Sequence, residues 1–303
     1  MDRRWRLLGA AVLAAYGLCA WAALDELSAA GTPSPHPAGE APVPCTAAPV
    51  GEEAAVPLFP EAEIRLKNDT SFAPDLSALL REPLTQTLPE EGAQILIIHT
   101  HGTEAFLPVS GEEYTASDPY RTTEAEHSVI RLGDELRALW EAQGFRVIHD
   151  RSLYDYPSYT GAYSRSREAV EGWLARCPDI ALVIDLHRDA AGEPDSPYRS
   201  LAKLEGEPTA QVMLVVGTGE NGLSHPLWRE NLKLALVLQA AAEEACPGLM
   251  RPIALCRERY NQHLTTGSLI LEVGSNGNTL SEAERAVERF AAAAVPVLRS
   301  LAG

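Results

Sequence analysis

The sequence has no paired cysteines and little positive charge, and each shortage excludes a class of protein. Its five cysteines are dispersed without any C-x-x-C pair, so neither a disulfide framework nor a structural zinc knuckle is indicated. Only 25 Lys and Arg residues stand against 42 Asp and Glu residues, which gives a net charge of −17. Because nucleic-acid binding requires Lys and Arg clustered against phosphates, we expect no nucleic-acid partner.

The N-terminus combines a basic cluster with an apolar run. The segment MDRRWR precedes an uncharged stretch from Leu7 to Leu24. About 18 apolar residues just reach the length of a membrane-spanning helix, and preceding arginines favour a cytoplasmic N-terminus. We therefore expect residues 1–28 to form a cytoplasmic stub and an uncleaved transmembrane anchor. A cleaved signal peptide is the alternative, because small residues near Ala30 resemble a cleavage site.

Two further regions follow the expected anchor. Residues 29–60 are rich in Pro, Ala and Gly without periodicity, and residues 61–90 are polar. This composition is typical of an extended, disordered chain, so residues 29–90 are expected to be a spacer and a lead-in. Residues 91–303 are expected to form one catalytic domain, which is within the usual size of a single domain.

Apolar runs alternate with helical patterns from Gln94 onward. Strands are expected at 95–99, 145–150, 180–187, 210–217, 252–256 and 268–274, and helices at 127–144, 164–177, 226–246 and from Ser281. Continuous apolar strands separated by helices indicate a sheet that is covered on both faces. The fold class expected is α/β, a single domain with a central, mostly parallel twisted sheet flanked by helices.

Residues able to bind a metal follow two of these strands. His101-x-x-Glu104 comes after the first strand, and His187 ends the third. Ligands of open α/β sheets gather at the carboxyl ends of strands, so these side chains are expected to meet. Two imidazoles, one carboxylate and an open fourth position are what a catalytic zinc requires. His99 lies two residues before His101, hence on the same face of a strand, and is an alternative ligand.

Three more residues complete the expected site. Glu272 interrupts the apolar strand SLILEVG, where a carboxylate is costly unless it has a role, and we expect it to be the general base. Arg188 and Arg121 are candidates to stabilise an oxyanion or a substrate carboxylate, although ordinary ion pairs are an equal alternative. Glu124, near the start of the first long helix, is an alternative to Glu104 as the acidic metal ligand.

Six segments carry a resemblance to a known family. HTHGTEAF, YRTTE, YPSYTGAYSRS, IDLHRDA, GTGENGLSHPLWRENLKLAL and NQHLTTGSLILEVGSNGNT occur in this order within residues 93–300. Together they are similar to the stage II sporulation protein P family of membrane-anchored peptidoglycan hydrolases. The resemblance implies a zinc-amidase-like fold, with Zn2+ held by His99 or His101, by Glu104 and by His187, and with Glu272 in catalysis.

The resemblance also implies an activity, a location and partners. The activity implied is that of an N-acetylmuramoyl-L-alanine amidase that removes stem peptides from glycan, with endopeptidase cleavage of cross-links. It would act in septal wall degradation and engulfment during sporulation, alongside the sporulation proteins D and M. The location implied is the cell membrane at the sporulation septum, single-pass, with the catalytic domain outside the cytoplasm.

Two other functions fit the same residues. A zinc carboxypeptidase-like peptidase acting on wall peptides also combines a His-x-x-Glu pair, a later His and a Glu on a late strand. The other alternative is a non-catalytic wall-binding scaffold whose histidines are structural. A dinucleotide fingerprint at Gly217-x-Gly219-x-x-Gly222 is discounted, because the acidic residue expected about 20 positions later would fall inside an Ala-rich helix.

Overall fold

The computed structural model describes residues 64–109, 113–193 and 196–302. The expected anchor at 1–28 and the Pro/Ala-rich part of the spacer lie outside the described residues. Within the described ranges, none of the helices combines the length and the apolar character needed to cross a bilayer.

The described elements alternate between strands and helices. The helices are α2 (Leu76–Arg81), α3 (Val129–Ala142), α4 (Ala162–Arg176), α5 (Trp228–Ala245) and α6 (Leu280–Ser300), with 3-10 turns at Ala125–His127 and Gln262–Leu264. The strands of the central sheet are β1 (Leu66–Asn68), β2 (Ile95–Ile98), β5 (Val147–His149), β6 (Leu182–Asp189), β11 (Val212–Gly217), β12 (Ile253–Cys256) and β13 (Ser268–Ser275). Two-stranded ribbons are formed by β3 (Ala116–Asp118) with β4 (Arg121–Thr122), β7 (Gly192–Glu193) with β8 (Ser196–Pro197), and β9 (Leu201–Leu204) with β10 (Glu207–Ala210).

The central sheet is mostly parallel, as its sequence predicts. Its seven strands lie in the order β1-β12-β11-β13-β6-β2-β5. All neighbouring pairs are parallel except β11 with β13. Every residue of β2, β6 and β13 is buried, which fits strands that are covered on both faces.

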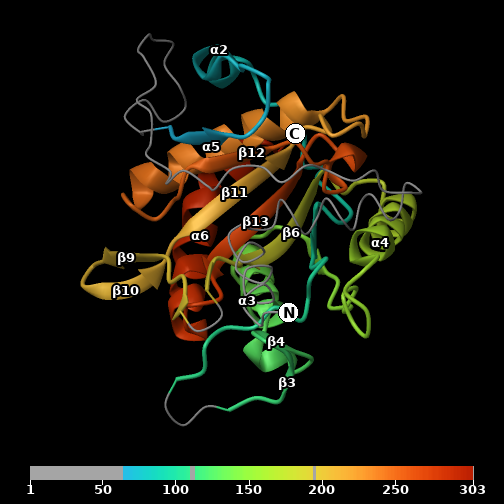
Figure 1. Cartoon of the computed structure of the whole chain (residues 1–303). Coiled ribbons are helices and arrows are strands. Elements are labelled where there is room, and N and C mark those ends of the chain that lie inside the picture. The colour runs from blue at the N-terminus through green and yellow to red at the C-terminus, as the bar shows by residue number, and fades with distance from the viewer. Residues whose placement is uncertain (1–63, 110–112, 194–195, 303) are drawn as a thin grey trace, which may run out of the picture.

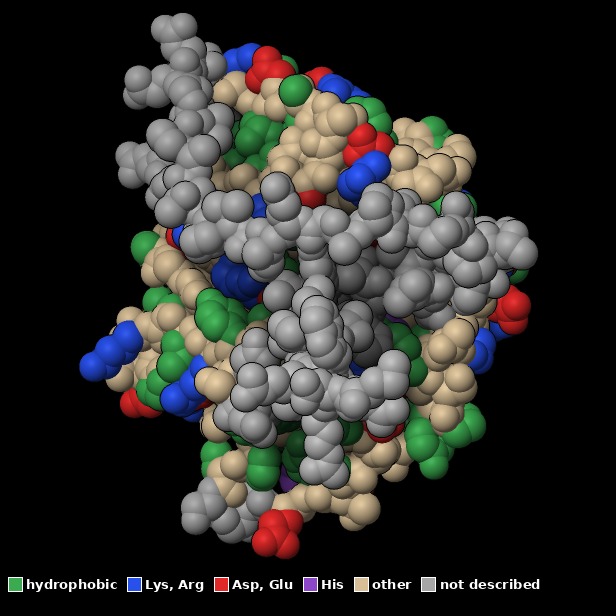
Figure 2. Space-filling model, viewed as in Figure 1, with side chains coloured by type: hydrophobic (Ala, Val, Ile, Leu, Met, Phe, Trp, Pro, Cys, Tyr) green, Lys and Arg blue, Asp and Glu red, His purple; other side chains and the backbone are tan. Residues whose placement is uncertain are grey.

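The two faces of the sheet carry different helices. Leu186 and Leu271 belong to the main core, which also contains the apolar sides of α3, α5 and α6. Val183 points to the other face, where it packs with Val170 of α4. Figure 1 shows α3 and α6 behind the central strands and α4 to one side. On the face seen in Figure 2, the acidic and basic side chains of the described residues are interspersed.

Local signals fix the starts of α3 and α6, two helices of the main core, and the end of α3. Ser128 caps α3 by accepting a hydrogen bond from the amide of Ile130, and a left-handed Gly144 follows the end of the helix. Thr279 and Glu282 form a reciprocal capping box at the start of α6. Both helices therefore begin at side-chain caps that their sequences carry.

Two elements lie within the stretch that the sequence assigned to a lead-in. β1 pairs in parallel with β12 and extends the central sheet, and α2 packs against α5. Regular structure thus begins before residue 91, the boundary expected from composition. The three residues of β1 and six of α2 are too short to give a recognisable periodicity.

Candidate active site

Three neighbouring strands bring the expected residues to one edge of the sheet. β13, β6 and β2 lie side by side and run parallel, so their carboxyl ends meet. His187 of β6 is directly opposite Glu272 of β13 in the register. Paired residues of adjacent strands point to the same face, which here is the face that carries α4. His101 and Glu104 approach the pair from the turn that follows β2.

Glu104 and His187 are in contact. Glu104 Oε2 lies 3.3 Å from His187 Nδ1 and accepts a hydrogen bond from the backbone N–H of Arg188 at 3.2 Å. Burial alone would raise the pKa of Glu104, but the Arg188 guanidinium and His187 outweigh it and hold the pKa below its usual range. Glu104 is therefore a carboxylate in the interior of the site.

His187 lies between two carboxylates. Its Nε2 is 2.9 Å from Asp185 Oδ1, and Asp185 is held in turn by the backbone N–H and the hydroxyl of Thr100. Burial lowers the pKa of His187, but Asp185 and then Glu104 raise it, and the net pKa is well above the ordinary value. An acceptor at Nε2 fixes the orientation of the ring and turns Nδ1 toward Glu104.

The imidazole ring of His101 is buried and lies next to that of His187. The two rings are 5.4 Å apart between centroids and cross at 80°. Tyr159 stacks on His101 at 4.4 Å, and Tyr163 contacts it edge-on at 5.6 Å. Burial, followed by the charge of Arg121, lowers the pKa of His101 well below the ordinary value, so its imidazole is neutral. Of the three tyrosines in YPSYTGAY, Tyr163 and Tyr159 thus pack on the site, whereas Tyr156 is 52% exposed.

Glu272 is fully buried with both carboxylate oxygens unpartnered among the described residues. Burial raises its pKa well above the ordinary value, against the opposing effect of His187. A raised pKa at a buried carboxyl group is a feature that catalytic acids and bases share. Glu272 therefore remains a candidate for proton transfer, opposite His187 in the sheet.

Two arginines hold the acidic residues in place. Arg188 donates from Nε to the carbonyl of Ala105 at 3.1 Å and from Nη2 to the carbonyl of Tyr120 at 2.8 Å, while Nη1 lies 3.6 Å from Glu104 Oε1. Arg121 donates from Nη1 to Asp155 at 2.6 Å and lies 3.5 Å from Glu104. Both arginines therefore contribute positive charge and connect the segment after β2 to the site.

Asp155 is a component that the sequence did not suggest. Its carboxylate accepts from the backbone N–H of Thr103 at 3.2 Å and from Arg121, and it is 4.0 Å from His101 Nδ1. Asp155 lies in the loop between β5 and α4, where a single aspartate between two tyrosines gives no signal. Its role depends on a contact across about fifty residues of chain.

His99 does not join this cluster, which corrects the expectation that it shares a face with His101. His99 Nδ1 donates to the carbonyl of Leu186, and Nε2 lies 2.8 Å from His149 Nε2. The ring faces α3, where a Cβ added to Gly133 would be 2.6 Å from it. The alternation of side chains along a strand does not extend to His99 and His101, because β2 ends at Ile98 and the chain then turns.

Glu124, the alternative to Glu104 as the acidic metal ligand, is hydrogen-bonded to another segment of the chain. Its carboxylate accepts a hydrogen bond from the backbone N–H of Thr115 at 2.9 Å. The contact with His187 is made by Glu104, so the structure favours the His-x-x-Glu spacing over the start of the first long helix.

The donor set suits zinc, although the described residues contain no group of three or more His, Cys, Asp or Glu side chains arranged to hold a metal ion. His101 Nδ1 is buried without a hydrogen-bond partner in the described part of the chain. The two ring nitrogens of His187 lie near Asp185 and Glu104 but outside regular hydrogen-bond geometry. Buried polar atoms in this state are costly unless something else binds them. Two imidazoles and one carboxylate are a zinc donor set, so the residues fit such an ion.

A buried carboxylate–imidazole cluster at the carboxyl edge of a mostly parallel sheet defines an α/β protein with a candidate hydrolytic centre. Residues 57–294 match the model of the stage II sporulation protein P (SpoIIP) family, and the chain belongs to this family. It is 29% identical over 222 residues to stage II sporulation protein P of Bacillus subtilis strain 168. That match covers 70% of this chain and 52% of the relative, so the chain spans about half of the relative's length.

Solved structures of cell-wall amidases show a weaker likeness. The CwlD amidase from Clostridioides difficile, solved in complex with the GerS lipoprotein, has 14% identity and a TM-score of 0.40, with 69% of this chain and 98% of that chain covered. The N-acetylmuramoyl-L-alanine amidase AmiC2 of Nostoc punctiforme has 12% identity and a TM-score of 0.38, with 68% and 97% covered.

Proposed function

We propose that the protein is a zinc-dependent N-acetylmuramoyl-L-alanine amidase with endopeptidase activity on stem-peptide cross-links. It acts on peptidoglycan in septal wall degradation and engulfment during sporulation. The observation that carries the proposal is the pairing of two buried residues in adjacent strands, His187 beside the carboxylate of Glu104 and Glu272 with both oxygens unpartnered among the described residues. Membership in the SpoIIP family supports the choice of substrate.

In this proposal His101, Glu104 and His187 hold the ion, and His99 has no part in binding it. The bound zinc supplies a Lewis acid that polarises the scissile amide carbonyl and lowers the pKa of a water molecule. Asp185 keeps the His187 ring oriented through Nε2, and Tyr159 holds the ring of His101 by stacking. Arg188 steadies Glu104 through its backbone N–H.

Glu272 moves the proton of the reaction. Its carboxylate accepts a proton from the attacking water and returns it to the leaving amine nitrogen. Glu272 itself is fully buried, so bulk water has little access to its carboxylate. Burial raises the pKa of Glu272 above its ordinary value, which favours the return of the proton from the carboxyl group to the leaving nitrogen.

The remaining parts of the proposal concern location and partners. Residues 7–24 are proposed to anchor the chain in the membrane with the catalytic domain outside, and the sporulation proteins D and M are proposed partners. The rival carboxypeptidase would require a free C-terminal carboxylate in its substrate. A comparison of intact sacculi with short free wall peptides therefore separates the two activities.

The test is replacement of His187 by Ala in the full chain. We expect muropeptide release from purified sacculi to fall by at least about 10³-fold, because His187 is a proposed ligand of the ion that activates the water. Zinc content should fall in parallel, while sedimentation with sacculi is retained. The matched control is His127→Ala, since His127 is a partly exposed histidine that contacts Tyr114. Release that persists in His187→Ala would contradict the metal assignment, and zinc-free wild type with full wall binding would favour a scaffold.

A further inference from the structure

A network of hydrogen bonds connects Asp185 of the candidate active site to two distant segments of the sequence. Thr100 donates its hydroxyl hydrogen to Asp185 Oδ2 at 2.6 Å, and Thr100 Oγ1 lies 2.8 Å from Ser166 Oγ of α4. Ser166 Oγ lies in turn 3.2 Å from Asn261 Nδ2, in the connection between β12 and β13. Thr100, Ser166 and Asp185 are buried, so the network runs through the interior of the domain.

The direction of the network follows from the number of hydrogens on each group. The carboxylate of Asp185 only accepts, so the single hydrogen of the Thr100 hydroxyl is used there. The hydrogen between the two hydroxyls therefore comes from Ser166, whose oxygen accepts from the Asn261 amide. Asn261 Nδ2 also donates to the carbonyl of Tyr163 at 2.8 Å, so both of its hydrogens are used. Donation thus begins at Asn261 and ends at Asp185.

Asn261 supports both imidazoles of the proposed zinc site. One branch ends at His187, because the final acceptor, Asp185, has its other oxygen 2.9 Å from His187 Nε2. The other branch passes through Tyr163, whose carbonyl accepts from Asn261 and whose ring meets that of His101 edge-on at 5.6 Å. A single amide side chain thus contacts the supports of two rings that follow different strands.

The backbone at Asn261 is suited to this position. Its φ is 60° and its ψ is 2°, and the preceding Tyr260 is also left-handed, with a φ of 52°. Asparagine adopts this conformation more readily than most residues other than glycine. Tyr260 is buried, and its ring lies 5.8 Å from that of Tyr163. These contacts hold the loop at the point from which the amide reaches α4.

A small cavity lies beside the network. Its volume is about 20 Å³, and its lining residues include Thr100, Ser166, Asp185 and Asn261. This space is sufficient for about one water molecule or one additional methyl group. Threonine can therefore replace Ser166 with its hydroxyl retained, whereas alanine removes the hydroxyl alone.

We propose that Asn261 is a positioning residue, which acts through this network to hold His187 in the orientation that binds the ion. The inference rests on the proposed function, in which His187 and His101 are ligands of zinc. Loss of a group that orients a metal-binding histidine typically lowers metal affinity or activity by about 10–100-fold. Asn261 lies two hydroxyls away from Asp185, so we expect the lower end of this range.

The test compares variants that break the network with a variant that preserves it. Asn261→Gly removes the amide but keeps a residue that tolerates the left-handed backbone, and Ser166→Ala removes one hydroxyl. We expect each to weaken zinc binding by about tenfold, measured by competition with a chelator, and to lower kcat for muropeptide release with little change in KM. Ser166→Thr retains the hydroxyl and should restore most of the zinc affinity.

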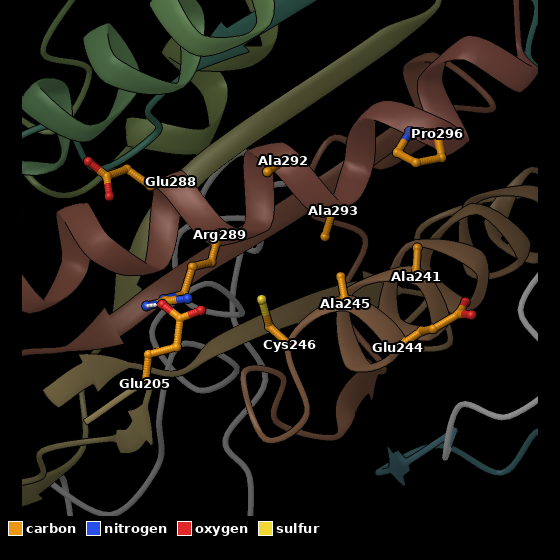
Figure 3. A pocket seen from close by; sticks show the side chains of 10 residues that line it. All are labelled: Glu205, Ala241, Glu244, Ala245, Cys246, Glu288, Arg289, Ala292, Ala293 and Pro296. Atoms are coloured by element: carbon orange, nitrogen blue, oxygen red, sulfur yellow. Dashed lines mark hydrogen bonds and ion pairs between the residues drawn. The ribbon is translucent and has the colours of Figure 1, made fainter. Parts of the chain in front are cut away.

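Two control variants separate positioning from a general loss of stability. Ser200→Ala removes a buried hydroxyl that is bonded to Gln211 Oε1 at 3.1 Å, outside the network. Ala241→Gly weakens α5, and Figure 3 shows Ala241 at the groove between α5 and α6, whose apolar sides pack on the other face of the sheet. Both variants should lower Tm yet keep the zinc affinity and kcat of the wild type.

A measurement without zinc makes the test independent of activity. In the zinc-free, full-length protein with ¹⁵N-labelled histidine, the imidazole signals of His187 are identified by their absence from His187→Ala. Asn261→Gly and Ser166→Ala should shift these signals, whereas Ser200→Ala should not. A wild type that binds no zinc but shows these shifts would contradict the proposed function and still support the positioning role.

Three results would overturn the inference. The first is that Asn261→Gly and Ser166→Ala keep both the zinc affinity and the His187 signals of the wild type. The second is an equal loss of zinc affinity in Ser200→Ala or Ala241→Gly, because the effect would then be one of stability alone. The third is a loss in Ser166→Thr as large as that in Ser166→Ala, because the hydroxyl would then have no part in the effect.

Discussion

Glu272 is a carboxyl residue in the interior of a fully buried strand. A charged carboxylate in a buried strand is unfavourable by several kcal/mol unless it is paired, and here both oxygens lack a hydrogen-bond partner among the described residues. The pKa of Glu272 is raised by this burial, and the residue opposite it in the sheet is His187. Such an arrangement lowers stability at the position, and under the proposed function it is offset by the use of Glu272 in proton transfer.

Glu272→Gln should therefore separate activity from stability. We expect muropeptide release to fall by about 10²–10⁴-fold, because a neutral amide cannot accept the proton. Zinc content should remain at the wild-type level, since Glu272 is not a proposed ligand. The free energy of unfolding at pH 7 should be equal to or greater than that of the wild type, because the amide removes a buried ionisable group. A fully active Glu272→Gln protein would rule out the role as base.

At the scale of elements, the contact between α3 and α6 contains a concentration of negative charge. Glu135 of α3 faces Glu284 and Glu288 of α6. Burial, then the charges of Glu284 and Glu288, raise the pKa of Glu135 to about 7. The capped starts of the two helices are clear in the sequence, but this opposition of carboxylates arises only when the helices pack.

The raised pKa of Glu135 gives the contact a defined pH dependence. Between about pH 4.5 and pH 7 the folded protein binds a proton at Glu135 that the unfolded chain has released, so stability falls as pH rises through this range. Glu135→Gln should remove the effect and raise the free energy of unfolding by roughly 0.5–1 kcal/mol at pH 8, a value reduced for solvent screening. At pH 4 the variant and the wild type should unfold alike. Urea unfolding at both pH values measures the difference, and an equal gain at pH 4 would contradict this origin.

At the scale of the whole molecule, the order of strands assembles the site. β2, β6 and β13 come from distant parts of the chain and become neighbours in the sheet. The proposed zinc would then join the turn after β2 to the end of β6. An ion bound in the folded state and not in the unfolded chain stabilises the fold by mass action.

Zinc should therefore raise the thermal stability of the whole domain. At a free zinc concentration of about 100 times Kd the gain is about 2.7 kcal/mol, which corresponds to an increase in Tm of about 5–10 °C for a domain of this size. Calorimetry with and without a chelator checks the shift, and removal of the ion should also abolish muropeptide release. The His187→Ala protein should show no zinc-dependent shift. An identical Tm with and without zinc in the wild type would argue against the site.

The sequence by itself determined the α/β class, the principal strands and helices, and the residues His101, Glu104, His187 and Glu272 as candidates. It could do so because apolar periodicity is a local property and because the family's segments keep their order. Only the tertiary structure decided that His99 turns toward α3, that Glu104 rather than Glu124 contacts His187, and that Asp155 belongs to the site. These outcomes depend on where the chain turns after a strand and on contacts between residues far apart in sequence. No periodicity encodes such contacts, because they form only when the sheet brings those segments together.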